Sequence, residues 1–374
     1  MDNVTTNNGS DFLNSDHTLQ HVVDLLSSRL IESLESFEKI QRQFDPGIIP
    51  HLRDTMLPFA ANLEASRKDF QAKPPPGFES FTAPLIKATD TAIDAFHLFM
   101  EPTDLQKSLT NAKKAGRKIC RAQEILFPLR RLFPSINQFF LEAPVWEQAD
   151  AFDPDRRHGI AVGLHHVGME ENPYARSSFS LYVPESYDGS QSWPLIVALH
   201  GGFGHGRDFL WTWFREARSR KFLLVAPSSQ ETTWSILGED VDHHIITKML
   251  EYVMTRWSVD PKRTLLTGLS DGATYALANA LDETTPFTAF APVSGVLPPF
   301  DLRHVKQRRI YWVHGALDWM FPVHHAMKGY TTLKQADAAV TLQVIEDLSH
   351  TYPREQNDHI LNWFDPSLAL PTSD

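Results

Sequence analysis

The sequence predicts an all-α helical bundle followed by an α/β domain, with a mostly parallel sheet and helices on both faces. In the N-terminal part, apolar residues recur at steps of three and four, which is the period of one helix face. From about residue 160, short apolar runs alternate with stretches of helix length, as in βαβ units. These patterns predict a disordered tail over 1–16, a helical domain over 17–150 and an α/β domain over 155–374.

The helical domain is expected to contain four amphipathic segments. The apolar face of the first segment is formed by Leu19, Val23, Leu26, Leu30, Leu34 and Phe37. The other three segments span Ile49–Gln71, Phe81–Met100 and Leu105–Phe140. The breaks between segments contain proline or glycine, as in FDPG and KPPPGFES, and these residues end helices. Four helices joined by short breaks are typical of an up-and-down bundle.

The α/β domain contains short apolar runs that we expect to form strands. These runs are FSLYVP, PLIVALH, FLLVAP, RTLLTG, FTAFAPV, RIYWVHG and VTLQVIED. Stretches of helix length lie between several of them, such as Val241–Trp257 and Ala273–Leu281. Continuous apolar strands indicate a sheet that is buried on both faces. The run GLHHVG near Gly163 is a candidate for an antiparallel edge strand.

Composition and charge exclude several classes of function. The 374 residues include 42% hydrophobic and 22% charged residues, which is typical of a globular protein with a large core. A formal net charge of −11 gives a surface that repels phosphate backbones, so no nucleic acid partner is expected. The single cysteine, Cys120, excludes an internal disulfide, and we interpret it as a small packed residue.

The N-terminus and the length of the apolar runs bear on localisation. The first residues, MDNVTTNNGSDFLNSD, are polar and lack the apolar stretch of a signal peptide. No apolar run reaches the roughly 18 residues that a membrane-spanning helix needs. Together with the lone cysteine, these features lead us to expect a cytoplasmic protein without a membrane span.

One serine stands between two glycines, where an expected strand meets an expected helix. The run continues from Gly268 through Leu269, Ser270 and Asp271 to Gly272. This G-x-S-x-G pattern holds a serine on a strained turn, and glycines flank it because larger side chains would clash. The helix N-terminus that follows directs amide groups at developing negative charge. We interpret Ser270 as a nucleophile, with a structural turn as the alternative.

A serine hydroxyl needs a base to take its proton, and the base needs an acid to orient it. In an open α/β sheet, functional groups gather beyond the carboxyl ends of the strands. Asp318 follows the expected strand RIYWVHG, and His350 follows VTLQVIED. The chain order Ser270, Asp318, His350 is the order expected for a nucleophile on this type of turn. We therefore assign His350 as the general base and Asp318 as the orienting acid.

Other histidines and carboxylates are weaker candidates for these roles. The competing histidines fall in expected helices, where we interpret them as surface or packing residues: His324, His325 and His359. The competing carboxylates are Asp347, which lies too close to His350 in the sequence, and Asp301, which has no strong strand directly before it.

Acyl transfer also requires fixed N–H donors for the oxyanion. The strand PLIVALH continues into the glycine loop His200–Phe203, where the backbone can approach a ligand closely. We expect the amides of Gly202 and Asp271 to be the donors, with the amide of Phe203 as a further candidate. His200 is interpreted as a structural residue that holds the loop. No Lys-Ser/Thr pair follows the glycines, which excludes a phosphate-binding P-loop.

Five stretches of the sequence together resemble the α/β-hydrolase superfamily of serine esterases. They are WPLIVALHGGFGHG, VDPKRTLLTGLSDGA, APVSG, VHGALDWMFPV and DLSHTYP. The resemblance covers roughly Ser178 to Phe364 and is nearest to the phospholipase/carboxylesterase and the poly(hydroxybutyrate)-depolymerase-like or feruloyl-esterase-like branches. It implies an α/β-hydrolase fold after the helical domain.

The resemblance also implies an activity and a set of site residues. The activity is ester hydrolysis through a covalent acyl-enzyme, without a cofactor. The nucleophile is carried over to Ser270, the acid to Asp318, the base to His350, and the oxyanion donors to Gly202 and Asp271. Two features depart from the family. We expect neither the export signal nor the disulfides of the secreted branches in this chain, and its N-terminal helical region has no counterpart in the minimal catalytic fold. Little room for a lid separates APVSG from RIYWVHG.

Aromatic residues are frequent in the loops expected around the site. They are Phe203, Phe209, Trp211, Trp213, Trp234, Trp319 and Phe321. The best candidates for a substrate pocket are Phe203, Trp234 and Trp319, whereas packing against the sheet is expected for two of the three aromatics between 209 and 213. No metal is expected, because the adjacent histidine pairs lack acidic partners at ligand spacing.

We conclude from the sequence that the protein is a serine carboxylesterase acting on a small-molecule ester. One alternative is a serine peptidase of the prolyl-oligopeptidase type, although its usual propeller domain cannot form from this helical half. Another is a catalytically silent interaction protein. Three roles stay open for the helical region from about Leu19 to Phe140. It covers the mouth of the site, it forms a homo-oligomer, or it is an independent binding module.

Overall fold

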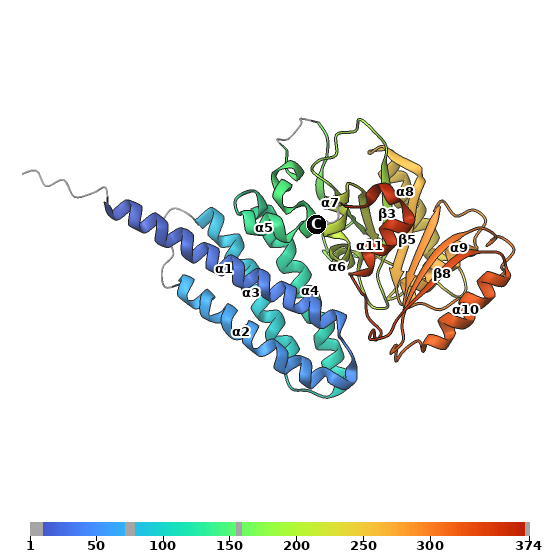
Figure 1. Cartoon of the computed structure of the whole chain (residues 1–374), viewed down its shortest axis with the longest axis horizontal. Helices are drawn as coiled ribbons and strands as arrows, with labels where there is room; N and C mark the ends of the chain where they lie inside the picture. Colours follow the sequence, from blue (N-terminus) through green and yellow to red (C-terminus); the bar gives the residue numbers. More distant parts are fainter. Residues whose placement is uncertain (1–9, 72–78, 155–158, 371–374) are drawn as a thin grey trace, which may run out of the picture. The chain divides into compact units, whose positions relative to one another are not determined.

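The computed structural model describes residues 10–71, 79–154 and 159–370. The chain divides into two compact units. The first runs up to Ile40 and resumes over Pro46–Phe139. The second consists of Gln41–Asp45 and of the chain from Phe140 onward. The first unit is all-α, and the second contains an eight-stranded sheet with helices on both faces (Figure 1).

The first unit consists of long helices joined by short connections. Its helices are α1 (Ser10–Arg42, whose last two residues belong to the second unit), α2 (Ile49–Gln71), α3 (Glu79–Met100), α4 (Leu105–Leu126) and α5 (Pro134–Phe139), with 3₁₀ turns η1 (Pro46–Ile48) and η2 (Phe127–Arg131). Helix α1 already includes residues 10–16, which the sequence assigns to the tail, and the rest of that tail lies outside the described residues. None of the described helices is both long enough and apolar enough to cross a bilayer.

The expectation of one helix over Leu105–Phe140 is wrong, because prolines divide it. Helix α4 starts at its N-cap Asp104, whose carboxylate accepts a hydrogen bond from the amide of Lys107 at 2.8 Å. The 3₁₀ turn η2 follows it and contains Pro128, and α5 begins at Pro134. Proline has no amide hydrogen and its ring clashes with the preceding turn, which favours a break at Pro128, although α2 and α3 continue through Pro58 and Pro84.

The apolar faces predicted from helical spacing form the core of the first unit. Leu26, Leu30 and Leu34 of α1 are fully buried. The ring of Phe37 lies 4.7 Å from that of Phe96 in α3, measured between centroids. Burial of such residues supplies most of the stability of a helical bundle, because helix propensity alone is weak.

The second unit is built on one mixed sheet. Its strands are β1 (Gly163–Val167), β2 (Phe179–Val183), β3 (Trp193–Leu199), β4 (Leu223–Pro227), β5 (Val259–Leu269), β6 (Ala289–Val293), β7 (Arg309–Gly315) and β8 (Ala339–Ile345). Their spatial order is β1-β2-β4-β3-β5-β6-β7-β8. Strands β3 to β8 are parallel, whereas β1 pairs antiparallel with β2, and β2 with β4. The expected antiparallel edge strand from GLHHVG is thus confirmed.

Helices cover both faces of this sheet (Figure 1). They are α6 (Gly206–Phe209), α7 (Phe214–Arg220), α8 (Val241–Met254), α9 (Asp271–Leu281), α10 (Val323–Gln335) and α11 (Gln356–Phe364), with 3₁₀ turns η3 (Ala143–Phe152), η4 (Leu210–Thr212) and η5 (Pro366–Leu368). Residues of α8, α9 and α10 share one apolar core with alternate residues of the strands. On the other face, the ring of Tyr182 in β2 lies 4.2 Å from that of Phe214 in α7.

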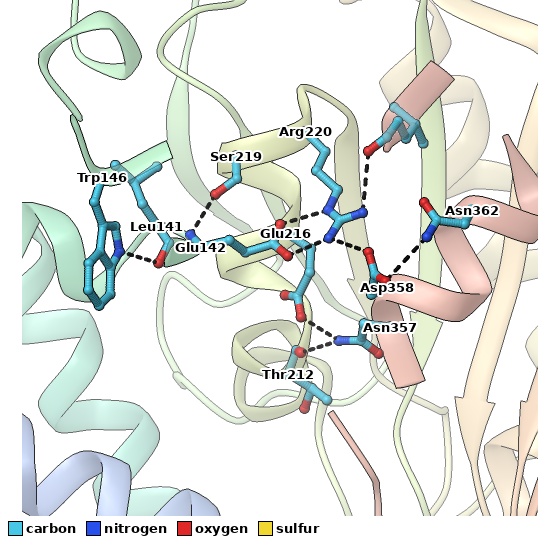
Figure 2. Close-up of polar contacts among 11 residues, drawn as sticks. Leu141, Glu142, Trp146, Thr212, Glu216, Ser219, Arg220, Asn357, Asp358 and Asn362 are labelled. Atoms are coloured by element: carbon cyan, nitrogen blue, oxygen red, sulfur yellow. Dashed lines mark hydrogen bonds and ion pairs between the residues drawn. The ribbon is translucent and has the colours of Figure 1, made fainter. Parts of the chain in front are cut away.

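A polar network binds the chain after Phe140 to helices α7 and α11 (Figure 2). The carboxylate of Glu142 accepts hydrogen bonds from Nε and Nη2 of Arg220, at 2.7 and 2.6 Å. The same Nη2 lies 2.8 Å from Oδ1 of Asp358 in α11. Nearby, Nδ2 of Asn357 donates to Oε1 of the buried Glu216 at 2.8 Å. These bonds explain why the second unit already begins at Phe140.

Candidate active site

Ser270 lies on the tight turn between β5 and α9, at the carboxyl edge of the sheet. Its backbone has φ 56° and ψ −116°, a strained conformation for a residue with a side chain. Its amide donates to the carbonyl of Val293 in β6 at 2.9 Å, which fixes the turn to the neighbouring strand. Its side chain is nearly buried.

The two glycines of the motif are required by close packing. A Cβ atom added at Gly272 would lie 2.6 Å from the carbonyl oxygens of Leu199 and His200. A Cβ atom added at Gly268 would lie 2.6 Å from the carbonyl carbon of Gly272. Because backbone atoms cannot yield as a flexible side chain can, only glycine lets helix α9 start this close to β3.

The structure brings Ser270, His350 and Asp318 together from three separate loops. The distance from Ser270 Oγ to His350 Nε2 is 2.9 Å. His350 Nδ1 lies 2.8 Å from Oδ2 and 3.0 Å from Oδ1 of Asp318. Because Nδ1 faces a carboxylate, it carries the proton, which leaves Nε2 as the acceptor for the serine hydroxyl. This arrangement can take a proton from Ser270 while the carboxylate balances the charge on the imidazole.

The carboxylate of Asp318 is itself held in place. Its Oδ1 accepts hydrogen bonds from the amides of Met320 and Phe321, at 3.0 and 2.7 Å. The buried His314, at the end of β7, donates from Nε2 to the carbonyl of Phe321 at 2.7 Å. Burial lowers the pKa of His314, so this imidazole is neutral beside the acid. Sequence reasoning did not single out His314. Its place at the end of the strand RIYWVHG, shortly before Asp318, could have indicated that it supports the loop of this acid.

The loop after β3 lies beside the nucleophile. A Cβ atom at Gly202 would lie 2.6 Å from Oδ2 of Asp271. Asp271 is the first residue of α9, where an amide has no partner within the helix. In the part of the chain that the structure describes, neither the amide of Gly202 nor that of Asp271 donates to a protein acceptor. The amide of Phe203 does, to the carbonyl of Thr232 at 2.7 Å. The suggestion of Phe203 as a further oxyanion donor is therefore wrong.

The structural role expected for His200 agrees with its contacts. His200 Nε2 accepts a hydrogen bond from the amide of Ser229 at 3.1 Å, so its proton is on Nδ1. Nδ1 then donates to the carbonyl of Gly201 at 2.8 Å. The imidazole thereby ties the glycine loop to the loop after β4.

The aromatic candidates separate into exposed and buried residues. Phe203 is 62% exposed and Trp319 is 45% exposed. The ring of Trp319 lies 6.2 Å from that of His350. Trp234, by contrast, is 2% exposed, and its Nε1 donates to the carbonyl of His200 at 2.7 Å. The structure therefore contradicts the expectation that Trp234 lines a substrate pocket.

The remaining aromatic candidates differ in burial, and the competing polar residues are exposed. Trp211 and Trp213 are buried as packing residues, whereas the ring of Phe321 lies 5.2 Å from that of His350. The competing histidines are exposed on α10 and α11: His324, His325 and His359. The competing carboxylates are exposed and pair with arginines: Asp301 and Asp347. Among the described residues, no group of three histidine, cysteine or acidic side chains is placed to hold a metal.

Comparisons with known proteins bear on the second unit. Residues 221–365 match the family described as phospholipase/carboxylesterase, which is less than half of the chain. No curated protein matches the sequence.

Several solved structures are similar to this chain. A thermostable esterase has 19% sequence identity and a TM-score of 0.44, and the alignment covers 50% of this chain and 58% of that one. An acetyl xylan esterase from Aspergillus awamori has 15% identity and a TM-score of 0.43, over 54% of this chain and 98% of that one. A Pyrococcus horikoshii acylaminoacyl peptidase has 16% identity and a TM-score of 0.43, over 53% of this chain and 40% of that one.

The family match includes the serine turn and the strands that carry Asp318 and His350. The sheet order and the placement of a serine between β5 and α9 agree with it. The chain therefore carries an α/β unit that is similar over residues 221–365 to the phospholipase/carboxylesterase family, with a helical region before the sheet.

Proposed function

We propose that the protein is a serine carboxylesterase that hydrolyses a small carboxylic ester through a covalent acyl-enzyme. The observation that carries this proposal is the continuous hydrogen-bonded chain from Ser270 Oγ through His350 to Asp318. All three side chains lie beyond the carboxyl ends of parallel strands, where α/β sheets place their functional groups.

Acylation starts when His350 Nε2 takes the proton of the Ser270 hydroxyl, which lies within hydrogen-bond distance. The serine oxygen attacks the ester carbonyl carbon, and the carbonyl oxygen becomes an oxyanion. The amides of Gly202 and Asp271 are the donors that stabilise it, because no protein acceptor competes for them in the described part of the chain. His350 then gives its proton to the leaving alcohol as the C–O bond breaks.

Deacylation repeats these steps with water. His350 takes a proton from a water molecule, whose oxygen attacks the acyl carbon. The bond to Ser270 breaks, and the serine oxygen recovers a proton from His350. Asp318 stabilises the imidazolium in both halves of the reaction, because its carboxylate faces Nδ1 and is fixed by two backbone amides.

A panel of p-nitrophenyl esters graded by acyl length tests this proposal with the full chain. The wild-type protein is expected to hydrolyse at least the short esters, and Ser270→Ala to lose several orders of magnitude in kcat, because members of such a unit act together. A Ser270→Ala protein that keeps more than roughly a tenth of the wild-type kcat would contradict it. Faster cleavage of peptide p-nitroanilides than of every ester would favour the peptidase alternative.

A further inference from the structure

The loop that carries His350 is bound by a segment more than 300 residues away in the sequence. The loop spans residues 346–355, between β8 and α11. The segment is Gln41–Asp45, which includes the end of α1 and belongs to the same compact unit as the sheet. The segment is called the 41–45 clamp below.

Two contacts of the clamp flank His350 directly. On one side, the hydroxyl of the buried Ser349 donates to Oδ2 of Asp45 at 2.8 Å. On the other side, the hydroxyl of Thr351 donates to the carbonyl of Gln41. The ring of His350 is oriented by Asp318, whereas the residues on both sides of it are held by the clamp.

Arg42 makes two further contacts nearer the ends of the loop. Its Nη2 lies 2.9 Å from Oδ1 of Asp347, and its Nε lies 2.5 Å from Oε1 of Glu355. The arginine side chain is 20% exposed, but the two carboxylate side chains are 80% and 50% exposed. Ion pairs this exposed contribute little to global stability. The rigid, planar guanidinium nevertheless fixes the positions of two residues at once.

We propose that the 41–45 clamp holds the loop so that His350 stays within hydrogen-bond distance of Ser270, and that Arg42 and Asp45 are positioning residues for catalysis. This inference rests on the proposed esterase function. A misplacement of about 1 Å at a reacting group can lower a rate about a hundredfold. Contacts that add little stability can therefore contribute substantially to kcat.

The test compares full-length Arg42→Ala and Asp45→Ala with the wild type. Each variant is expected to lower kcat by about tenfold to a hundredfold, with KM little changed and a thermal midpoint within about 3 °C. Asp45→Asn keeps an acceptor for the Ser349 hydroxyl and is expected to restore most of kcat. The matched control is Arg29→Ala, which removes an exposed arginine of α1 that pairs with Glu32 and is expected to leave kcat unchanged.

Hydrogen exchange provides a readout that does not depend on activity. Amides within 346–355 are expected to exchange faster in Arg42→Ala than in the wild type or in Arg29→Ala. Wild-type kcat and wild-type exchange in both alanine variants would overturn the clamp and leave the esterase proposal standing. A fall in kcat with a large loss of thermal midpoint, not restored by Asp45→Asn, would also overturn it. If the wild type hydrolyses no ester, the esterase function fails, and exchange alone decides whether the clamp holds the loop.

Discussion

The substitution Asp318→Asn tests the hydrogen-bond assignment on His350 most sharply. Oδ1 of Asp318 accepts two backbone amides, so the asparagine oxygen is expected to take that position. The NH₂ group then faces His350 Nδ1 in place of Oδ2, which lies 2.8 Å away in the wild type. A donor in that place forces the imidazole proton from Nδ1 to Nε2. His350 can then no longer accept the proton of Ser270.

The expected loss is about 10⁴-fold in kcat, the size found when a triad acid is replaced by its amide, or about 5.5 kcal/mol in the activation barrier. Stability is expected to change little, because the amide oxygen keeps both backbone hydrogen bonds. Steady-state hydrolysis of a p-nitrophenyl ester and thermal denaturation measure the two quantities. Asp318→Ala is the matched control. It removes the carboxylate and, unlike Asp318→Asn, leaves the two backbone amides without their acceptor, so it is expected to lower the thermal midpoint.

A loss of less than about tenfold in Asp318→Asn would refute this reasoning. It would mean that the imidazole does not depend on the carboxylate for its tautomer. A large fall in the thermal midpoint of Asp318→Asn would contradict the assigned orientation of the amide.

Three further predictions follow from burial and packing. Burial raises the pKa of Glu216, so its stabilising contribution is present below the ordinary carboxyl pKa and is lost as the pH rises through the raised value. Glu216→Gln is therefore expected to flatten the decline in unfolding free energy with rising pH, measured by urea denaturation, and an unchanged slope would contradict it. Gly202→Ala places a Cβ atom 2.6 Å from Oδ2 of Asp271 and is expected to lower kcat by up to about 10²-fold, the cost of losing one oxyanion donor, because the carboxylate must shift beside the two amides; an unchanged kcat would contradict their role. Trp319→Ala is expected to change KM and acyl preference, whereas Trp234→Phe costs about 1 kcal/mol of stability with unchanged preference; the opposite pattern would restore Trp234 as a pocket residue.

The sequence was sufficient to predict where the three site residues meet, because the fold supplies the geometry. Ser270, Asp318 and His350 each follow a parallel strand, and the carboxyl ends of parallel strands share one edge of the sheet. The apolar strands and the helical faces were also predictable, since periodicity reports burial directly.

The features that sequence reasoning missed depend on how loops fold back. Trp234 follows a strand end, which favoured a place at the site, but its loop turns inward and buries the indole against Tyr275, with a centroid distance of 5.4 Å. The contacts of Arg42 and Asp45 with the His350 loop join residues more than 300 positions apart, and no local pattern encodes such a contact. Helix α4 ends at Leu126, just before Pro128, whereas α2 and α3 continue through Pro58 and Pro84, so the presence of a proline alone does not locate a helix end.

Covalent labelling with a fluorophosphonate tests the central claim most directly, because the reagent reacts with activated serines and mimics the acylation step. Intact-mass analysis of the full chain is expected to show one adduct per protein, located at Ser270 by peptide mapping. The adduct is expected to be absent in Ser270→Ala and strongly slowed in His350→Ala, but unchanged in His324→Ala. An adduct on another residue, or ester hydrolysis that persists while Ser270 stays unlabelled, would contradict the account.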